Sequence, residues 1–196
     1  MSTPKIIWYE GAIYHITTRG NRRSKIFLDE QDFRVYLNKL DDSLHYYDYL
    51  NYELISYCLM SNHVHLIIKT GKEPLTRIMG RLNSTYTKYF NKKYNYIGHL
   101  FQSRYFSELI KDDKQILEVS RYIHLNPVRA NIVKKPEYYK WSSYSMFIGK
   151  TSKKTINPEI ILDYFSKRNR DILYKEFVEN ALSINKEGGK LSGYSG

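Results

Sequence analysis

Two histidines separated by one residue are the first feature of this sequence that could do chemistry. His63 and His65 flank Val64 in an apolar segment that is typical of a β-strand. Side chains two residues apart in a strand point to the same face of a sheet, so the two imidazoles would project together and could bind a metal ion. On its own such a pair is more often structural than metal-binding, so a metal site requires a third ligand.

A helix further along the chain offers that third ligand. Tyr122 and Asn126 are four residues apart, which places them one turn apart on the same helix face. We expect this helix to end at about Leu125, because the residue before a proline disfavours helical geometry and Pro127 follows. The amide oxygen of Asn126 would then be free to face the sheet. Two imidazoles and one amide oxygen, with a phosphate substrate, suit Mg²⁺ or Mn²⁺, and Zn²⁺ is also compatible.

The same helix would bring a phenol close to the metal ion. A phenol is a weak nucleophile at its ordinary pKa of about 10, and a neighbouring cation favours its ionised form. Tyr122 is therefore a candidate nucleophile for attack on a phosphodiester that the metal ion polarises. The chain contains 20 tyrosines, so spacing alone leaves Tyr86, Tyr89 and Tyr105 as rivals.

The charge of the chain favours a polyanionic partner. Lys and Arg number 31 against 20 Asp and Glu, which gives a formal net charge of +11. Aromatic residues make up 15% of the chain, and they could stack on unpaired bases while the cations pair with phosphates. This combination favours single-stranded nucleic acid, although a basic protein with merely solvated lysines would have the same composition.

One basic turn is the best candidate for contacts with DNA. Arg19, Asn21, Arg22 and Arg23 lie at the end of a predicted strand, where they could reach phosphates. The alternative is a solvated basic turn without a ligand. Arg104 could likewise contact DNA or support the site. The remaining histidines are interpreted as packing or surface residues: His15, His45, His99 and His124.

The elements that would position these residues follow a regular order. β-Branched and aromatic residues predict strands over 11–20, 52–60, 63–69 and 104–110, with Ser61 and Asn62 as the turn of a hairpin. Apolar residues at spacings of three and four predict helices that begin near Asp29, Pro74 and Asp112. The order predicts an α+β fold, with a ferredoxin-like antiparallel sheet and helices mainly on one face.

We expect the chain to have three parts. Residues 1–150 would form one domain with all the candidate site residues, residues 151–187 a C-terminal helical extension, and residues 188–196 a flexible tail rich in glycine. No apolar run approaches the roughly 18 residues that a membrane span needs. The start of the chain lacks a signal peptide and the only cysteine is Cys58, so we expect a cytoplasmic, nucleoid-associated protein without an intrachain disulfide.

Four segments together resemble the Y1 transposases, which are single-tyrosine HUH nucleases, and in particular the REP-associated branch related to the IS200/IS605 enzymes. The resemblance covers about residues 5–150. The segments are YHITTRGNRR (14–23), MSNHVHLI (60–67), GHLFQSRY (98–105) and YIHLNPVRA (122–130). Four segments in one order are far more specific than any one of them.

The resemblance implies a fold and a reaction. The fold would be that of the HUH nucleases, with His63 and His65 as metal ligands, Tyr122 as the nucleophile and Asn126 as the third ligand. IS200/IS605 enzymes usually have glutamine at that last position, and the REP-associated branch accepts asparagine. The family cleaves single-stranded DNA near a hairpin, leaves a 5′-phosphotyrosine and a free 3′-OH, and uses no nucleotide cofactor. IS200/IS605 enzymes act as dimers and the REP-associated branch as monomers, so a monomer is favoured and a homodimer is possible.

Two other functions are compatible with parts of this pattern. A nucleic-acid-binding module without chemistry could have the same order of elements, as RNA-recognition domains do, but their basic and aromatic strand motif is absent from the sequence. A domesticated transposase could bind hairpins for the host, with cleavage retained or lost. The intact set of His63, His65, Tyr122 and Asn126 favours the enzyme.

Overall fold

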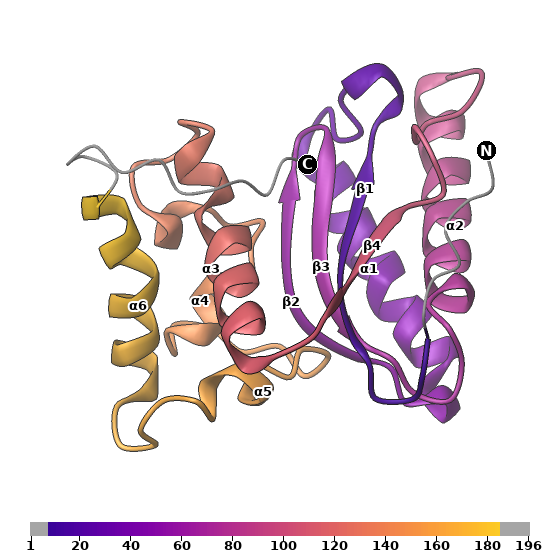
Figure 1. The fold of residues 1–196 in the computed structure, drawn as a ribbon. Coiled ribbons are helices and arrows are strands. Elements are labelled where there is room, and N and C mark those ends of the chain that lie inside the picture. Colours follow the sequence, from indigo (N-terminus) through magenta and orange to yellow (C-terminus); the bar gives the residue numbers. More distant parts are fainter. Residues whose placement is uncertain (1–7, 185–196) are drawn as a thin grey trace.

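The computed structural model describes residues 8–184 and shows a four-stranded antiparallel sheet between two groups of helices (Figure 1). The strands are β1 (Ile13–Arg19), β2 (Glu53–Met60), β3 (His63–Lys69) and β4 (Phe106–Ile110). Their order in the sheet is β2-β3-β1-β4, so β1 and β3 occupy the centre. The prediction of an α+β fold with a ferredoxin-like sheet is confirmed.

The two central strands present different chemistry on their two faces. On one face lie the apolar side chains of the alternate positions, namely Tyr14, Ile16, Val64, Leu66 and Ile68. On the other face β3 carries His63 and His65, and the antiparallel register pairs Arg19 with His63 and Thr17 with His65. The pairing of β1 with β3 therefore fixes which β1 side chains accompany the histidines.

The apolar face is covered by α1 (Glu30–Tyr46) and α2 (Thr76–Tyr94), which pack side by side (Figure 1). Asp29 caps α1 as predicted: its carboxylate accepts from the amide of Asp32, and the carboxylate of Asp32 accepts from the amide of Asp29. Each helix buries one apolar stripe, represented by Tyr36 and Leu40 in α1 and by Leu82 in α2.

The opposite face is covered by the helices of the C-terminal half, which are α3 (Asp113–Arg129), α4 (Tyr144–Phe147), α5 (Glu159–Leu162) and α6 (Arg170–Ile184) (Figure 1). The expectation of helices mainly on one face describes α1 and α2 but is wrong for this second group. The physical reason lies in β2, whose Ile55, Cys58 and Met60 are buried in a second apolar core with α3 and α6. Short 3₁₀ helices cover Asn21–Arg23, Asp48–Leu50 and Pro136–Tyr138.

Helix α3 continues past its proline. It ends at Arg129, so the prediction that it stops at about Leu125 is wrong. A proline removes one backbone hydrogen bond, but Pro127 lies in the last turn, and the amide of Ala130 still donates to the carbonyl of Asn126 at 2.9 Å. Asn126 is consequently an internal helical residue rather than a free helix end.

The segment after residue 150 packs against the rest of the protein. It contains α5 and α6, and α6 buries Tyr174, Val178 and Ala181 in the second core. The predicted tail over 188–196 lies outside the described residues. No helix within residues 8–184 combines the length and the apolar character that a membrane span requires.

Candidate active site

The sheet face beneath α3 holds a cluster of three histidines. His65 is buried and His63 is partly buried, and their ring centroids are 4.9 Å apart. The third member is His15 of β1, whose ring stacks on that of His65 at 5.1 Å. The sequence predicts a packing or surface role for His15, but the alternation of β1 places it on the same face as Thr17, the partner of His65 in the register, and so beside the histidine pair.

The surroundings of His65 leave one ring nitrogen available. Nδ1 of His65 lies 3.0 Å from Nε2 of His15 and 3.2 Å from the hydroxyl of Thr17. Nε2 is buried and has no hydrogen-bond partner among the described residues. A buried polar atom without a partner carries a cost in free energy, and a bound cation would remove that cost.

Hydrogen bonds also fix the orientation of His63. The side-chain amide of Asn62 donates from Nδ2 to the carbonyl of Arg23 at 3.2 Å, which turns its Oδ1 toward His63. Nδ1 of His63 lies 2.6 Å from this oxygen and must donate, because an amide oxygen can only accept. The lone pair of His63 is therefore on Nε2, the nitrogen that a metal ion would use.

All three imidazoles are neutral near pH 7. Burial lowers the pKa of His15 to about 4. Burial, with a smaller repulsion from Arg19, lowers the pKa of His63 to about 4. Burial and the neighbouring His15, His63 and Arg19 hold the pKa of His65 well below its ordinary value. A neutral imidazole has a lone pair to give to a cation, whereas a protonated one has none.

Helix α3 places Tyr122 against this cluster. The ring centroid of Tyr122 lies 5.5 Å from that of His65 and 6.2 Å from that of His15. The guanidinium of Arg129 lies 5.4 Å from the centroid of the same phenol ring. Asn126, one turn beyond Tyr122, donates from Nδ2 to the carbonyl of Tyr122 at 3.2 Å, so Oδ1 is the atom that it could offer to a cation. Two strands and one helix of a single chain thus bring the predicted nucleophile to the histidines.

The donor types near Tyr122 bear on which cation this face could hold. His15, His63 and His65 lie together but do not form a group of three that could hold a metal ion by themselves, and no other three His, Cys, Asp or Glu side chains within residues 8–184 do so. A closed structural zinc site is therefore absent from this part of the chain. Two imidazole nitrogens and an amide oxygen would leave positions for water and phosphate oxygens, as expected for Mg²⁺ or Mn²⁺.

The predicted DNA-binding residues fall into two groups. Arg19 lies beside the histidines, and Asn21, Arg22 and Arg23 form the adjoining 3₁₀ turn. Arg22 and Arg23 are exposed and have φ angles of 52° and 61°, in the left-handed region that is uncommon for residues other than glycine.

The turn also depends on a close approach between Gly20 and the backbone. A side chain at position 20 would meet the carbonyl oxygen of Ser24 at 2.1 Å, so glycine is required there. Arg104, in contrast, is exposed, and its carbonyl accepts from Asn83 of α2, which lies on the other face of the sheet.

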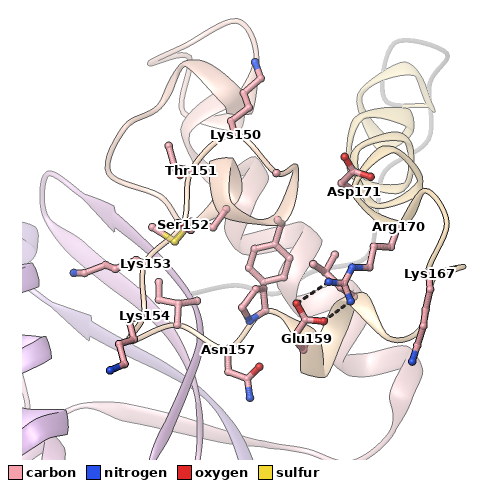
Figure 2. A pocket seen from close by; sticks show the side chains of 16 residues that line it. Lys150, Thr151, Ser152, Lys153, Lys154, Asn157, Glu159, Lys167, Arg170 and Asp171 are labelled. Carbon is pink, nitrogen blue, oxygen red and sulfur yellow. Dashed lines mark hydrogen bonds and ion pairs between the residues drawn. The ribbon is translucent and has the colours of Figure 1, made fainter.

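A separate cavity of about 920 Å³ opens between the loop after α4 and the start of α6 (Figure 2). None of its lining residues comes from β1, β3 or α3. Its basic side chains are Lys150, Lys153, Lys154, Lys167 and Arg170. Arg170 is paired with Glu159 across the cavity, and Lys150 and Lys153 form ion pairs with Glu137 and Asp41. The cavity is therefore separate from the histidine cluster, and most of its basic side chains are already paired with carboxylates.

Comparison with known proteins gives three consistent findings. Residues 9–126 match the family model of the IS200-like transposases. A Haemophilus influenzae protein described as a REP-associated tyrosine transposase is 24% identical over 157 residues, which cover 74% of this chain and 86% of that protein. The solved structure of a REP-associated tyrosine transposase bound to a REP hairpin matches with a TM-score of 0.63 at 16% identity, covering 80% of this chain and 98% of that one. This last likeness shows a shared fold.

Proposed function

Because the chain belongs to the family of IS200-like transposases, we propose that it is a metal-dependent single-stranded DNA endonuclease and strand-transferase that acts near DNA hairpins. One observation supports this most directly. The phenol of Tyr122 on α3 lies against His65 on β3, with a centroid distance of 5.5 Å, and Asn126 follows one turn later. The residue types match the roles of nucleophile and metal ligands, and all come from one chain.

Each residue has a defined part in the proposed reaction. The phenolic oxygen of Tyr122 forms a bond to the scissile phosphorus while the bond to the 3′-oxygen breaks; the phenol loses a proton and the departing oxygen gains one. A Mg²⁺ or Mn²⁺ ion, held by His63, His65 and Asn126, would polarise the scissile phosphate. The product is a 5′-phosphotyrosine with a free 3′-OH, which can attack the link later and rejoin strands. The covalent link retains the bond energy, so no nucleotide cofactor is needed.

The basic turn beside the histidines supplies the proposed DNA contacts. Arg19, Asn21, Arg22 and Arg23 would pair with phosphates on either side of the scissile bond. A hairpin substrate is supported by the REP-associated relative of the same fold, which is bound to a REP hairpin. We assign Arg104 to DNA binding as well, on the α2 side. Such a substrate would place the protein at the nucleoid, and a site built from one chain favours a monomer.

The test is covalent capture of DNA. Purified protein is mixed with Mg²⁺ or Mn²⁺ and a labelled pool of single-stranded oligonucleotides, each with a hairpin flanked by randomised sequence. We expect an adduct that survives denaturing electrophoresis and carries a label placed on the 3′ side of the cleaved bond, whereas a label on the 5′ side should leave with the free 3′-OH. Tyr122→Phe should abolish the adduct, because the nucleophilic oxygen is gone and the ring is kept.

Two controls make the result decisive. Tyr138→Phe removes a phenolic oxygen from an exposed tyrosine outside the site and should leave adduct formation unchanged. Chelation by EDTA should prevent adduct formation by the unaltered protein. An adduct formed by Tyr122→Phe at the normal rate would disprove the assignment of the nucleophile. Hairpin binding without any adduct would favour a binding module instead.

A further inference from the structure

A buried polar network connects α3 to the sheet and to α6. Its centre is His124, which projects from α3 about 200° around the helix from Tyr122, since successive residues are about 100° apart. Nδ1 of His124 lies 2.7 Å from the hydroxyl of Tyr174 on α6. Nε2 of His124 lies 2.9 Å from the hydroxyl of Ser143, the residue before α4. The hydroxyl of Ser56 on β2 lies 3.1 Å from Nε2 as well.

Every member of this network is buried. Ser143 also donates to the carbonyl of Tyr57 and accepts from its amide, which anchors the network to β2. The hydroxyl of Tyr174 lies 3.0 Å from that of Ser120, one turn before His124 on α3. Water cannot replace a lost partner easily at such depth, so these groups are satisfied only when α3, β2 and α6 keep their relative positions.

The ring of Tyr174 is held independently of its hydroxyl. It packs against Phe147 at 4.8 Å and Phe165 at 5.6 Å between ring centroids. Removing the oxygen alone would therefore keep the apolar packing of α6 and delete only its hydrogen bonds to His124 and Ser120. The chain thus permits a test of the polar contacts separate from the packing.

We infer that His124 and Tyr174 are positioning residues, which fix the rotation and height of α3 so that Tyr122 and Asn126 lie over the histidine pair. The inference rests on the proposed function of that site. Tyr174 lies beyond residues 9–126, the part that matches the family model, so the C-terminal region supplies part of the geometry of the site. A helix held only by apolar contacts could rotate or slide by small amounts, whereas hydrogen bonds to two ring nitrogens define one position.

The experiment compares two tyrosine variants of the full chain. Tyr174→Phe removes the hydroxyl that contacts α3. Tyr144→Phe removes a hydroxyl from the same core, but that hydroxyl bonds to Glu179 of α6 and not to α3. For each we measure the single-turnover rate of adduct formation and the dissociation constant for the same DNA hairpin.

We expect Tyr174→Phe to slow adduct formation on the order of tenfold or more with unchanged DNA affinity, since a displacement of about 1 Å can lower a rate by about 100-fold. Tyr144→Phe should react at the normal rate. A merely structural role of Tyr174 predicts similar behaviour of the two variants, because both lose a tyrosine hydroxyl from one core.

Amide hydrogen exchange of α3 gives a readout that does not depend on activity. Exchange over residues 120–129 should be faster in Tyr174→Phe and unchanged in Tyr144→Phe. A normal reaction rate for Tyr174→Phe, or an equal loss in both variants, would overturn the inference. If the unaltered protein forms no adduct, the proposed function fails. The inference is then judged by hydrogen exchange alone, and equal exchange in all three proteins would overturn it.

Discussion

The Nε2 atoms of His63 and His65 are the two atoms on which the proposed metal site depends. In each ring the other nitrogen, Nδ1, is already occupied: by Asn62 for His63, and by His15 and Thr17 for His65. The contact with Asn62 sets the tautomer of His63, and the contacts of His65 orient its ring, before any metal ion arrives. A ligand atom that is oriented in advance loses little conformational freedom on binding, which favours affinity.

Asn62 is the most direct residue with which to test this arrangement. We predict that Asn62→Ala lowers the affinity for Mn²⁺ by about 10- to 100-fold, the usual effect of losing a partner of a metal-bound histidine. The reason is that His63 loses the acceptor that fixes its tautomer. The measurement is a titration with Mn²⁺ followed by electron paramagnetic resonance or calorimetry.

Ser61→Ala is the matched control, because Ser61 lies in the same turn and contributes its backbone carbonyl rather than its side chain to the contacts with Ile26 and Phe27. This variant should bind Mn²⁺ normally. Normal affinity in Asn62→Ala would mean that His63 needs no such partner.

At the scale of elements, the start of α1 is joined to the end of α2 by a buried carboxylate. Asp32 is fully buried, accepts from the amide of Leu28, and receives hydrogen bonds from Lys93, Tyr89 and Tyr94. Burial alone would raise the pKa of Asp32, but these donors outweigh it and lower the pKa. The ionised form is therefore the one that holds the two helices together.

We predict that Asp32→Asn lowers the free energy of unfolding at pH 7 by about 1.5–3 kcal/mol, the range for a hydrogen bond to a charged group. Chemical denaturation of both proteins measures this difference. Glu30→Gln is the control: Glu30 lies two residues earlier on α1, and its ion pairs with Arg34 and Lys140 are exposed, so little loss is expected.

The pH dependence of this difference in unfolding free energy follows from the direction in which the pKa of Asp32 is shifted. A carboxyl whose pKa is lower in the folded than in the unfolded protein contributes stability above its unfolded value, about 3.8 for Asp, and loses it as the pH falls through the folded value. The difference between Asp32→Asn and the unaltered protein should be constant from about pH 8 to pH 5 and shrink only below about pH 4. A change between pH 8 and pH 5 would show that another group is responsible.

At the scale of the whole molecule, the segment after residue 150 is part of the fold rather than an independent appendage. The side chains of Ile161, Leu162, Tyr174, Val178 and Ala181 are buried in the second core, where they pack with α3 and β2. Burial of one large apolar side chain contributes about 1.5–3 kcal/mol. Several such contributions approach the whole stability of an ordinary domain, which is about 5–15 kcal/mol.

We therefore predict that a chain shortened to residues 1–150 does not keep a native second core. It should lose near-ultraviolet circular dichroism and bind the dye ANS, whereas the full chain should unfold in one cooperative transition. A chain shortened only to residues 1–184 is the control and should behave like the full protein, because the described part of the core is retained. Native spectra and an unchanged unfolding midpoint for residues 1–150 would show that the C-terminal region is separable.

Local periodicity in the sequence determined much of what this protein is. The alternation of β3 predicted that His63 and His65 share a face, and the spacing of four predicted that Tyr122 and Asn126 share a helix face; the structure has both. The cap at Asp29 and the four strands were predicted as well. These features follow from the fixed repeats of about 2 and 3.6 residues, which involve only neighbours in the chain.

The tertiary structure decided what no repeat can encode. The register between β1 and β3 placed His15 beside His65. That register depends on which residues of the two strands pair, and the paired residues are some 50 positions apart in the chain. Burial of the second face of β2 decided that α3 covers the histidines. It also made His124 a structural link to α6. Such contacts are settled by the burial of apolar surface between distant segments, so they become visible only when the whole chain is folded.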